Sequence, residues 1–97
     1  MAVNSDAHKE YERRHSPIWN DLREVLKQHG VRNYSIFLEP GTSQLFAYVE
    51  IESEDLWMQI AETDACRRWW AFMRDLMPAN EDNSPGSTDL VEVFHLD

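Results

Sequence analysis

The sequence from residue 33 to residue 51 is Asn33-Tyr-Ser-Ile-Phe-Leu-Glu-Pro-Gly-Thr-Ser-Gln-Leu-Phe-Ala-Tyr-Val-Glu-Ile51, and it predicts a β-hairpin. Its two halves, Asn33 to Leu38 and Gln44 to Ile51, are rich in the aromatic and β-branched residues that favour strands. The intervening Glu39-Pro-Gly-Thr-Ser43 is typical of a turn. Helical patterns flank the hairpin on both sides, so the hairpin indicates an α+β fold.

A helical pattern precedes the hairpin. Ser5 or Asp6 is placed to cap a helix. The helix is expected to run towards His29 and to stop at Gly30. Pro17 interrupts it, because its ring clashes with the preceding turn, so we expect a kink just before it or two helical pieces. Seven residues recur every three or four positions and therefore share one face of the predicted helix: Tyr11, His15, Ile18, Trp19, Leu22, Val25 and Leu26.

Two further helical patterns follow the hairpin. Ser53 is placed to cap a short helix that runs to about Ala61. Thr63 or Asp64 is placed to cap a second helix, which Pro78 ends. This helix contains the adjacent pair Trp69-Trp70, whose side chains point about 100° apart and form a broad aromatic wall. Such a wall suits a flat, apolar and hydroxylated ligand.

The C-terminal part of the chain predicts a loop and then a strand. Residues 78–88 have the composition of a loop, and Leu90 to Leu96 alternates apolar and polar side chains. With the stub Met1 to Asn4 as a shortened first strand, the order becomes βαββαβ, a ferredoxin-like arrangement within one domain spanning residues 1–97. Helices then cover one face of the sheet, and we expect a second copy of the chain to cover the other as a homodimer.

Composition excludes some classes of partner. The 97-residue chain has a net charge of −9, which argues against nucleic acid. Its two basic pairs, Arg13-Arg14 and Arg67-Arg68, are flanked by acids and are expected to be solvated helix faces. No apolar run is long enough to cross a membrane, and the N-terminus does not resemble a signal peptide. Cys66 is the only cysteine, so we expect a cytoplasmic protein in which this thiol is buried.

One pair of side chains is placed for proton transfer. Tyr11 and His15 lie four residues apart, on one side of the first helix. Imidazole exchanges protons near neutral pH, but the spacing alone is a weak signal and favours two half-buried helix residues. No metal site is expected, because His8, His15, His29 and His95 lack the spacing of zinc ligands. No cofactor motif is present.

Four segments in order resemble the L-rhamnose mutarotase family. They are Asp6-Ala-His-Lys-Glu-Tyr-Glu-Arg-Arg-His-Ser-Pro-Ile-Trp19; Val49-Glu-Ile-Glu52 followed by Trp57; Cys66-Arg-Arg-Trp-Trp70 ahead of Met77-Pro-Ala-Asn-Glu-Asp-Asn-Ser-Pro85; and Glu92-Val-Phe-His-Leu96. The resemblance covers nearly the whole chain. It departs at the N-terminus, where family members carry further residues that form most of the first strand. Either the start assigned to the chain lies too late, or the stub and a partner subunit compensate.

The resemblance implies an isomerase of carbohydrate metabolism that interconverts the α and β anomers of L-rhamnopyranose without a cofactor. It also implies a dimeric α/β barrel. By similarity His15 falls on the family's proton donor, and four residues fall on positions that contact the sugar: Tyr11, Tyr34, Trp69 and Trp70.

The expected reaction opens the ring at C1, rotates the aldehyde and closes the ring on the other face. Opening needs an acid at the ring oxygen and a base at the anomeric hydroxyl. We expect His15 to be the acid, and the base stays open between a tyrosine, a carboxylate and water. Two alternatives stay open at this level: a cofactor-free monooxygenase of the dimeric α/β-barrel type, and a non-catalytic sugar-binding module.

Overall fold

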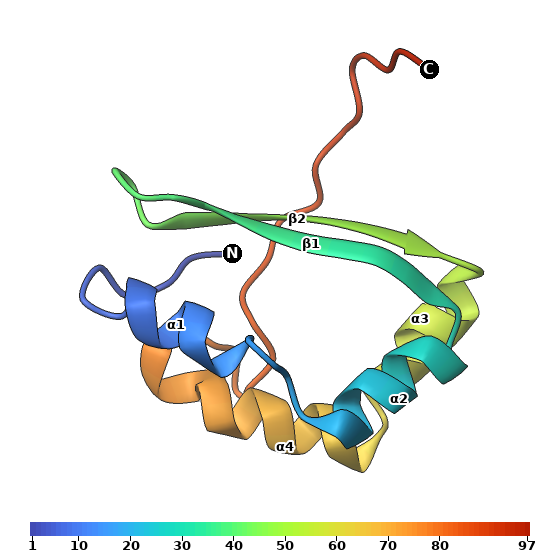
Figure 1. The fold of residues 1–97 in the computed structure, drawn as a ribbon, viewed down its shortest axis with the longest axis horizontal. Coiled ribbons are helices and arrows are strands. Elements are labelled where there is room, and N and C mark those ends of the chain that lie inside the picture. The colour runs from blue at the N-terminus through green and yellow to red at the C-terminus, as the bar shows by residue number, and fades with distance from the viewer.

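A computed structural model describes all 97 residues and confirms the α+β class. A two-stranded antiparallel sheet lies over a layer of four helices (Figure 1). The elements are α1 (His8–Arg14), α2 (Asn20–Gln28), β1 (Val31–Glu39), β2 (Gln44–Ile51), α3 (Glu54–Ile60), α4 (Asp64–Met73) and the 3₁₀ turn η1 (Arg74–Leu76). No helix is long and apolar enough to cross a bilayer.

The predicted hairpin is confirmed, and β2 has the bounds that the sequence indicates. Its register contains one irregularity that the sequence does not reveal. Arg32 pairs with Glu50 and Ser35 with Tyr48, so two residues, Asn33 and Tyr34, lie opposite one on β2. Asn33 adopts a positive φ of 48° at this bulge, a conformation that asparagine tolerates better than most residues. The bulge allows Tyr34 to lie on the helix-facing side of the sheet.

The predicted helix before the hairpin is divided, as Pro17 indicates, into α1 and α2. The cap expected from Ser5 or Asp6 is wrong, because Ala7 occupies the N-cap of α1 without a side-chain hydrogen bond. The start of α1 is instead held by long-range contacts. The amide of Asn4 donates to the carbonyl of Leu76, and the side chain of Asn4 donates to the carbonyl of Asp75.

The two helices after the hairpin begin as predicted. The hydroxyl of Ser53 accepts from the amide of Leu56 at 3.1 Å, and that of Thr63 accepts from the amide of Cys66 at 3.3 Å. The second of these helices, α4, continues into η1 and ends before Pro78. The Trp69-Trp70 pair therefore lies in the last half of α4.

The predicted strand over Leu90 to Leu96 is wrong for this structure. Residues from Gly86 onward form no backbone hydrogen bond and are not assigned to any strand. In Figure 1 this segment leaves the helical layer, passes the sheet and ends well away from it. A strand needs a neighbouring backbone, and the alternating pattern alone does not supply one. The apolar side chains of this segment are consequently exposed: Leu90, Val91, Val93, Phe94 and Leu96.

The N-terminal stub occupies part of the place of a first strand. The amide of Val3 donates to the carbonyl of Ser43, and Ala2 forms a single bridge with Gln44 at the start of β2. Val3 is also buried in the core. The stub thus adds one bridge and one core side chain to this end of the sheet.

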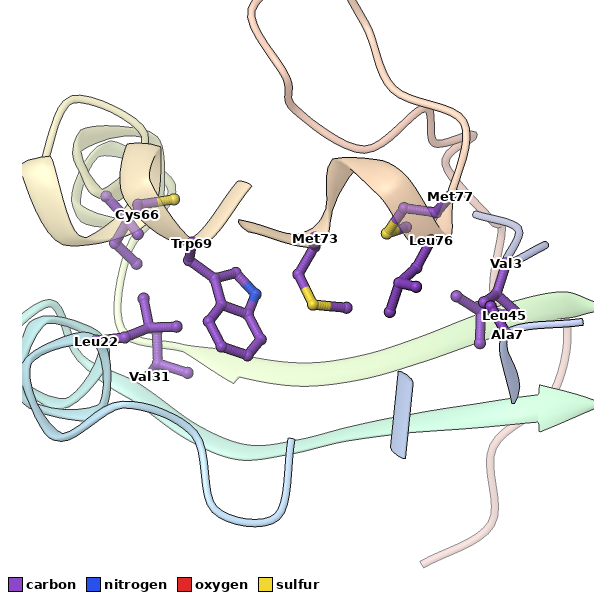
Figure 2. Packing of buried hydrophobic residues seen from close by; sticks show 11 residues of the cluster. Val3, Ala7, Leu22, Val31, Leu45, Cys66, Trp69, Met73, Leu76 and Met77 are labelled. Carbon is purple, nitrogen blue, oxygen red and sulfur yellow. The ribbon is translucent and has the colours of Figure 1, made fainter. Parts of the chain in front are cut away.

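The hydrophobic core lies between the sheet and α4. Figure 2 shows Cys66, Leu22 and Val31 at one end of it, and Val3, Ala7 and Leu45 at the other. The two ends are joined by Trp69 and Met73, whose side chains point from α4 towards the sheet. The core is small, since 12 of 97 residues are buried, so each large side chain contributes a large share of the stability.

Gly30 ends α2 with a backbone that other residues adopt only with strain. Its φ is +78°, and a Cβ there would lie 2.5 Å from the Cβ of Glu52. We expect Gly30→Ala to lower the free energy of unfolding by about 1–3 kcal/mol, as measured by urea denaturation. Gly86→Ala is the matched control, because nothing lies within 4 Å of a Cβ at that position. Equal stability of the two variants would contradict this explanation.

Candidate active site

A large open hollow lies between the sheet and the helices. Its volume is about 1790 Å³, and it is lined mainly by apolar side chains from β1, β2 and α4. The sequence-predicted site residues all line it: Tyr11, His15, Tyr34, Trp69 and Trp70. A hollow of this volume is much larger than one monosaccharide, so the five predicted residues mark only the candidate site within it.

His15 follows the last residue of α1 and is half-buried. Its Nδ1 lies 2.7 Å from the carbonyl oxygen of Tyr11, one turn earlier. Its ring stacks on that of Tyr11 at 4.3 Å and meets Trp69 edge to face at 5.1 Å. Burial lowers the pKa of His15, although the Tyr11 carbonyl acts in the opposite direction. The imidazole is therefore fixed on three sides and favours its neutral form.

The two tyrosines of the site come from different layers. Tyr11 lies on α1, and burial together with the nearby hydroxyl of Tyr34 raises its pKa to about 12. Tyr34 lies on β1, and burial raises its pKa as well, even though the whole residue is 40% exposed. These two observations agree if the hydroxyl points inward and part of the ring faces solvent. Both phenols stay protonated at neutral pH and provide hydrogen-bond donors.

The two tryptophans have different environments. Trp69 is buried in the core and meets Trp19 edge to face at 5.2 Å, as well as His15. Trp70 is only partly buried and packs at the edge of the core. Trp69 therefore has a structural role in addition to any contact with a ligand, whereas Trp70 has more surface free for one.

A model of the L-rhamnose mutarotase family matches residues 1–96. The chain belongs to the L-rhamnose mutarotase family. It is therefore an isomerase that acts on a carbohydrate.

Relatives within this family are close in sequence and in structure. The chain is 60% identical over 96 residues to the L-rhamnose mutarotase of Shigella flexneri serotype 5b, covering 99% of this chain and 92% of that protein. It is 58% identical to that of Tolumonas auensis, with the same coverage. Among solved structures, the L-rhamnose mutarotase of Formosa agariphila matches with a TM-score of 0.91 at 37% identity, covering 100% of this chain and 93% of that one.

One residue that supports the candidate site was not predicted from the sequence. The sequence predicts that Arg13 and Arg14 both lie on a solvated helix face. This prediction holds for Arg13 and is wrong for Arg14. The Arg14 guanidinium donates to the carbonyl of Phe72 at 2.7 Å and pairs with Asp75 at 2.9 Å. It also pairs with Glu10 at 2.8 Å. Arg14 thereby ties α1, which carries Tyr11 and His15, to the end of α4. Sequence spacing could predict the pair with Glu10 only.

The other histidines have separate partners. His8 is hydrogen-bonded to the Ser43 hydroxyl at 2.8 Å, and His29 Nδ1 lies 2.7 Å from the Val25 carbonyl. His95 lies in the exposed C-terminal segment beside Asp97. No group of three potential metal ligands occurs. Cys66 is buried, and burial raises its pKa to about 11, so its thiol is a poor nucleophile.

The loop after η1 is ordered by its own hydrogen bonds. The amide of Asn80 donates to the carbonyl of Ser84 at 2.8 Å, and Asp82 accepts from the amide of Ser84 at 3.0 Å. Arg74 donates to the side chain of Asn83 at 2.6 Å. Part of this loop lines the hollow. Polar groups of the loop thus form part of the lining of the hollow.

Proposed function

We propose that the hollow binds L-rhamnopyranose beside His15, and that His15 exchanges the proton that opens and closes the ring. The observation that carries this proposal is the position of the imidazole. Its Nδ1 is engaged by the Tyr11 carbonyl, which leaves Nε2 as the only ring nitrogen available to a ligand. No other half-buried histidine has aromatic rings of both α1 and α4 beside it within the hollow.

The surrounding side chains suit a sugar with a methyl group. Trp69 and Trp70 provide an apolar wall for the C–H faces and for C6, and each indole N–H is a donor for a hydroxyl. Tyr11 and Tyr34 supply hydroxyl groups from two opposite layers. We assign these four residues to substrate binding, with Trp70 making the larger contact because Trp69 is mostly enclosed by protein.

The binding assignment is tested with Trp70→Ala. Loss of one stacking face should weaken L-rhamnose binding roughly tenfold or more, about 1.4 kcal/mol, while the fold is retained. Saturation-transfer difference NMR gives the affinity, and Arg67→Ala on the exposed side of α4 is the control. Equal affinity of the Trp70→Ala and wild-type proteins would remove Trp70 from the site.

We also propose that a second copy of the chain covers the outer face of the sheet, forming the dimeric α/β barrel of a ferredoxin-like fold. This face carries Phe37 and Tyr48, which are 60% and 55% exposed. The unpaired apolar segment Leu90 to Leu96 emerges on the same side of the molecule (Figure 1). Exposed apolar surface of this extent is typical of an interface. With a single buried thiol, we place this dimer in the cytoplasm.

The dimer is tested by light scattering coupled to size exclusion. The wild type should elute with twice the chain mass of 11.5 kDa. Phe37→Lys should shift it towards the monomer, because a charge would be buried between two sheets. Met58→Lys is the control, since Met58 is an exposed apolar residue on α3, away from this face. A monomeric wild type at micromolar concentration would contradict the proposal.

A further inference from the structure

The hydrogen bond of His15 defines which proton its ring can move. A backbone carbonyl oxygen only accepts hydrogen bonds, so the 2.7 Å contact between His15 Nδ1 and the Tyr11 carbonyl places a hydrogen on Nδ1. In a neutral imidazole, Nε2 then carries a lone pair and no hydrogen. In that form Nε2 takes up a proton and has none to give.

The surroundings of His15 favour that neutral form. Tyr11 is its titratable contact, and two further titratable groups of the hollow come from other elements, Tyr34 from β1 and Cys66 from α4. Burial keeps all three uncharged at neutral pH. His8 and four charged side chains also line the hollow, and none of them hydrogen-bonds to His15; the four are Lys9, Glu12, Asp82 and Asp89. An imidazolium at this position would therefore have no ion-pair partner. Burial accordingly lowers the pKa of His15.

We propose that Nε2 of neutral His15 removes the proton of the anomeric hydroxyl during ring opening, and that the Tyr11 hydroxyl gives a proton to the ring oxygen. This inference rests on the proposed function. In this step His15 accepts a proton, whereas the sequence suggested that it donates one. Tyr11 is the donor because the two oxygens involved share one carbon, so the acid and the base must be close neighbours. The rings of Tyr11 and His15 are stacked with their centroids 4.3 Å apart, so Tyr11 is the hydroxyl-bearing side chain that contacts the base.

After one turnover, each proton and each electron pair is back on the group from which it started. In opening, the O1–H proton moves to Nε2, the C1–O1 bond becomes a carbonyl, and the C1–O5 bond breaks with its electrons on O5. The Tyr11 proton completes the O5 hydroxyl. After rotation about C1–C2, the tyrosinate takes the proton back from O5 as O5 attacks C1. The imidazolium returns its proton to O1. His15 is thus a base in opening and an acid in closing.

The pH dependence of kcat/KM separates the two directions, because this parameter reports the ionisation of the free enzyme. The rate of anomer exchange is measured by magnetisation transfer, after subtraction of the rate in buffer alone. If neutral His15 is required, kcat/KM falls roughly tenfold per pH unit once the pH drops below the lowered pKa of His15. Between the pKa of His15 and about pH 8, kcat/KM does not change with pH. A rate that instead rises as the pH drops through this region would overturn the inference, since it would require the imidazolium.

The tautomer is tested directly by ¹⁵N NMR. At pH 7 the His15 nitrogens should give one protonated Nδ1 signal and one unprotonated Nε2 signal. Assignment comes from the spectrum of His15→Gln. A doubly protonated ring, or a hydrogen on Nε2 alone, would overturn the inference. This readout does not depend on activity.

Tyr11→Phe tests the donor. It should lower kcat by at least tenfold with a smaller change in KM, and it should keep the acid limb of the profile. Retention of wild-type kcat would overturn the assignment of Tyr11. The failures are distinguishable. A fully active His15→Gln variant would refute the proposed function itself, whereas an inactive His15→Gln with an inverted pH profile in the wild type would refute only the direction of transfer.

Discussion

His15→Gln should lower the rate of L-rhamnose anomer exchange by about 10²- to 10⁴-fold, the usual contribution of a positioned acid or base. Glutamine retains a polar side chain that reaches the hollow, but it does not ionise near neutral pH. The rate is obtained from magnetisation transfer between the two anomeric protons, corrected for spontaneous exchange. The circular dichroism spectrum and the thermal midpoint should stay close to those of the wild type, because His15 is only half-buried.

His29→Gln is the matched control for this experiment. His29 follows α2, and its Nδ1 contacts the Val25 carbonyl at 2.7 Å, the same local arrangement as in His15. It does not line the hollow. The control variant should therefore keep the wild-type rate. Near-full activity of His15→Gln, or an equal loss in both variants, would contradict the assignment of His15.

Trp69→Ala should lower the free energy of unfolding by about 3–5 kcal/mol, as expected when a large buried aromatic side chain is truncated. The indole is 9% exposed and joins the two ends of a small core (Figure 2). It also packs against Trp19 and His15. In so small a domain this loss is a large part of the total stability. Urea denaturation followed by circular dichroism gives the value.

Trp69→Phe separates the structural role of this residue from its role beside His15. Phenylalanine fills most of the core volume but has a smaller edge facing the imidazole, so stability should fall less than in Trp69→Ala while anomer exchange still slows. Trp70→Ala is the neighbouring comparison, because Trp70 is only partly buried. If Trp69→Ala destabilised the protein no more than Trp70→Ala, the core position of Trp69 would be refuted.

Local chemistry explains which parts of the fold the sequence predicted correctly. The β-forming residues of Gln44 to Ile51 specify a strand on their own. The helix starts at Ser53 and Thr63 depend on one side chain and an amide three residues later. The break at Pro17 follows from the proline ring itself. Each of these features is determined within a few residues of chain, so a pattern in the sequence is enough to predict it.

Features that depend on distant partners were missed or were predicted wrongly. The bulge at Asn33 depends on the register with β2. The contacts of Arg14 across the helical layer depend on Phe72 and Asp75, which lie about 60 residues away. The segment Leu90 to Leu96 has the pattern of a strand but meets no free backbone. The resemblance to the mutarotase family indicated the candidate site residues, but the hydrogen bond that leaves Nε2 of His15 free is visible only in the structure.

A crystal structure with L-rhamnose bound tests the central claim most directly. We expect one pyranose in the hollow beneath the sheet, with Nε2 of His15 within hydrogen-bond distance of O1 and with an apolar sugar face against Trp70. A sugar bound outside the hollow, or a His15 ring turned so that Nε2 faces only protein, would contradict it.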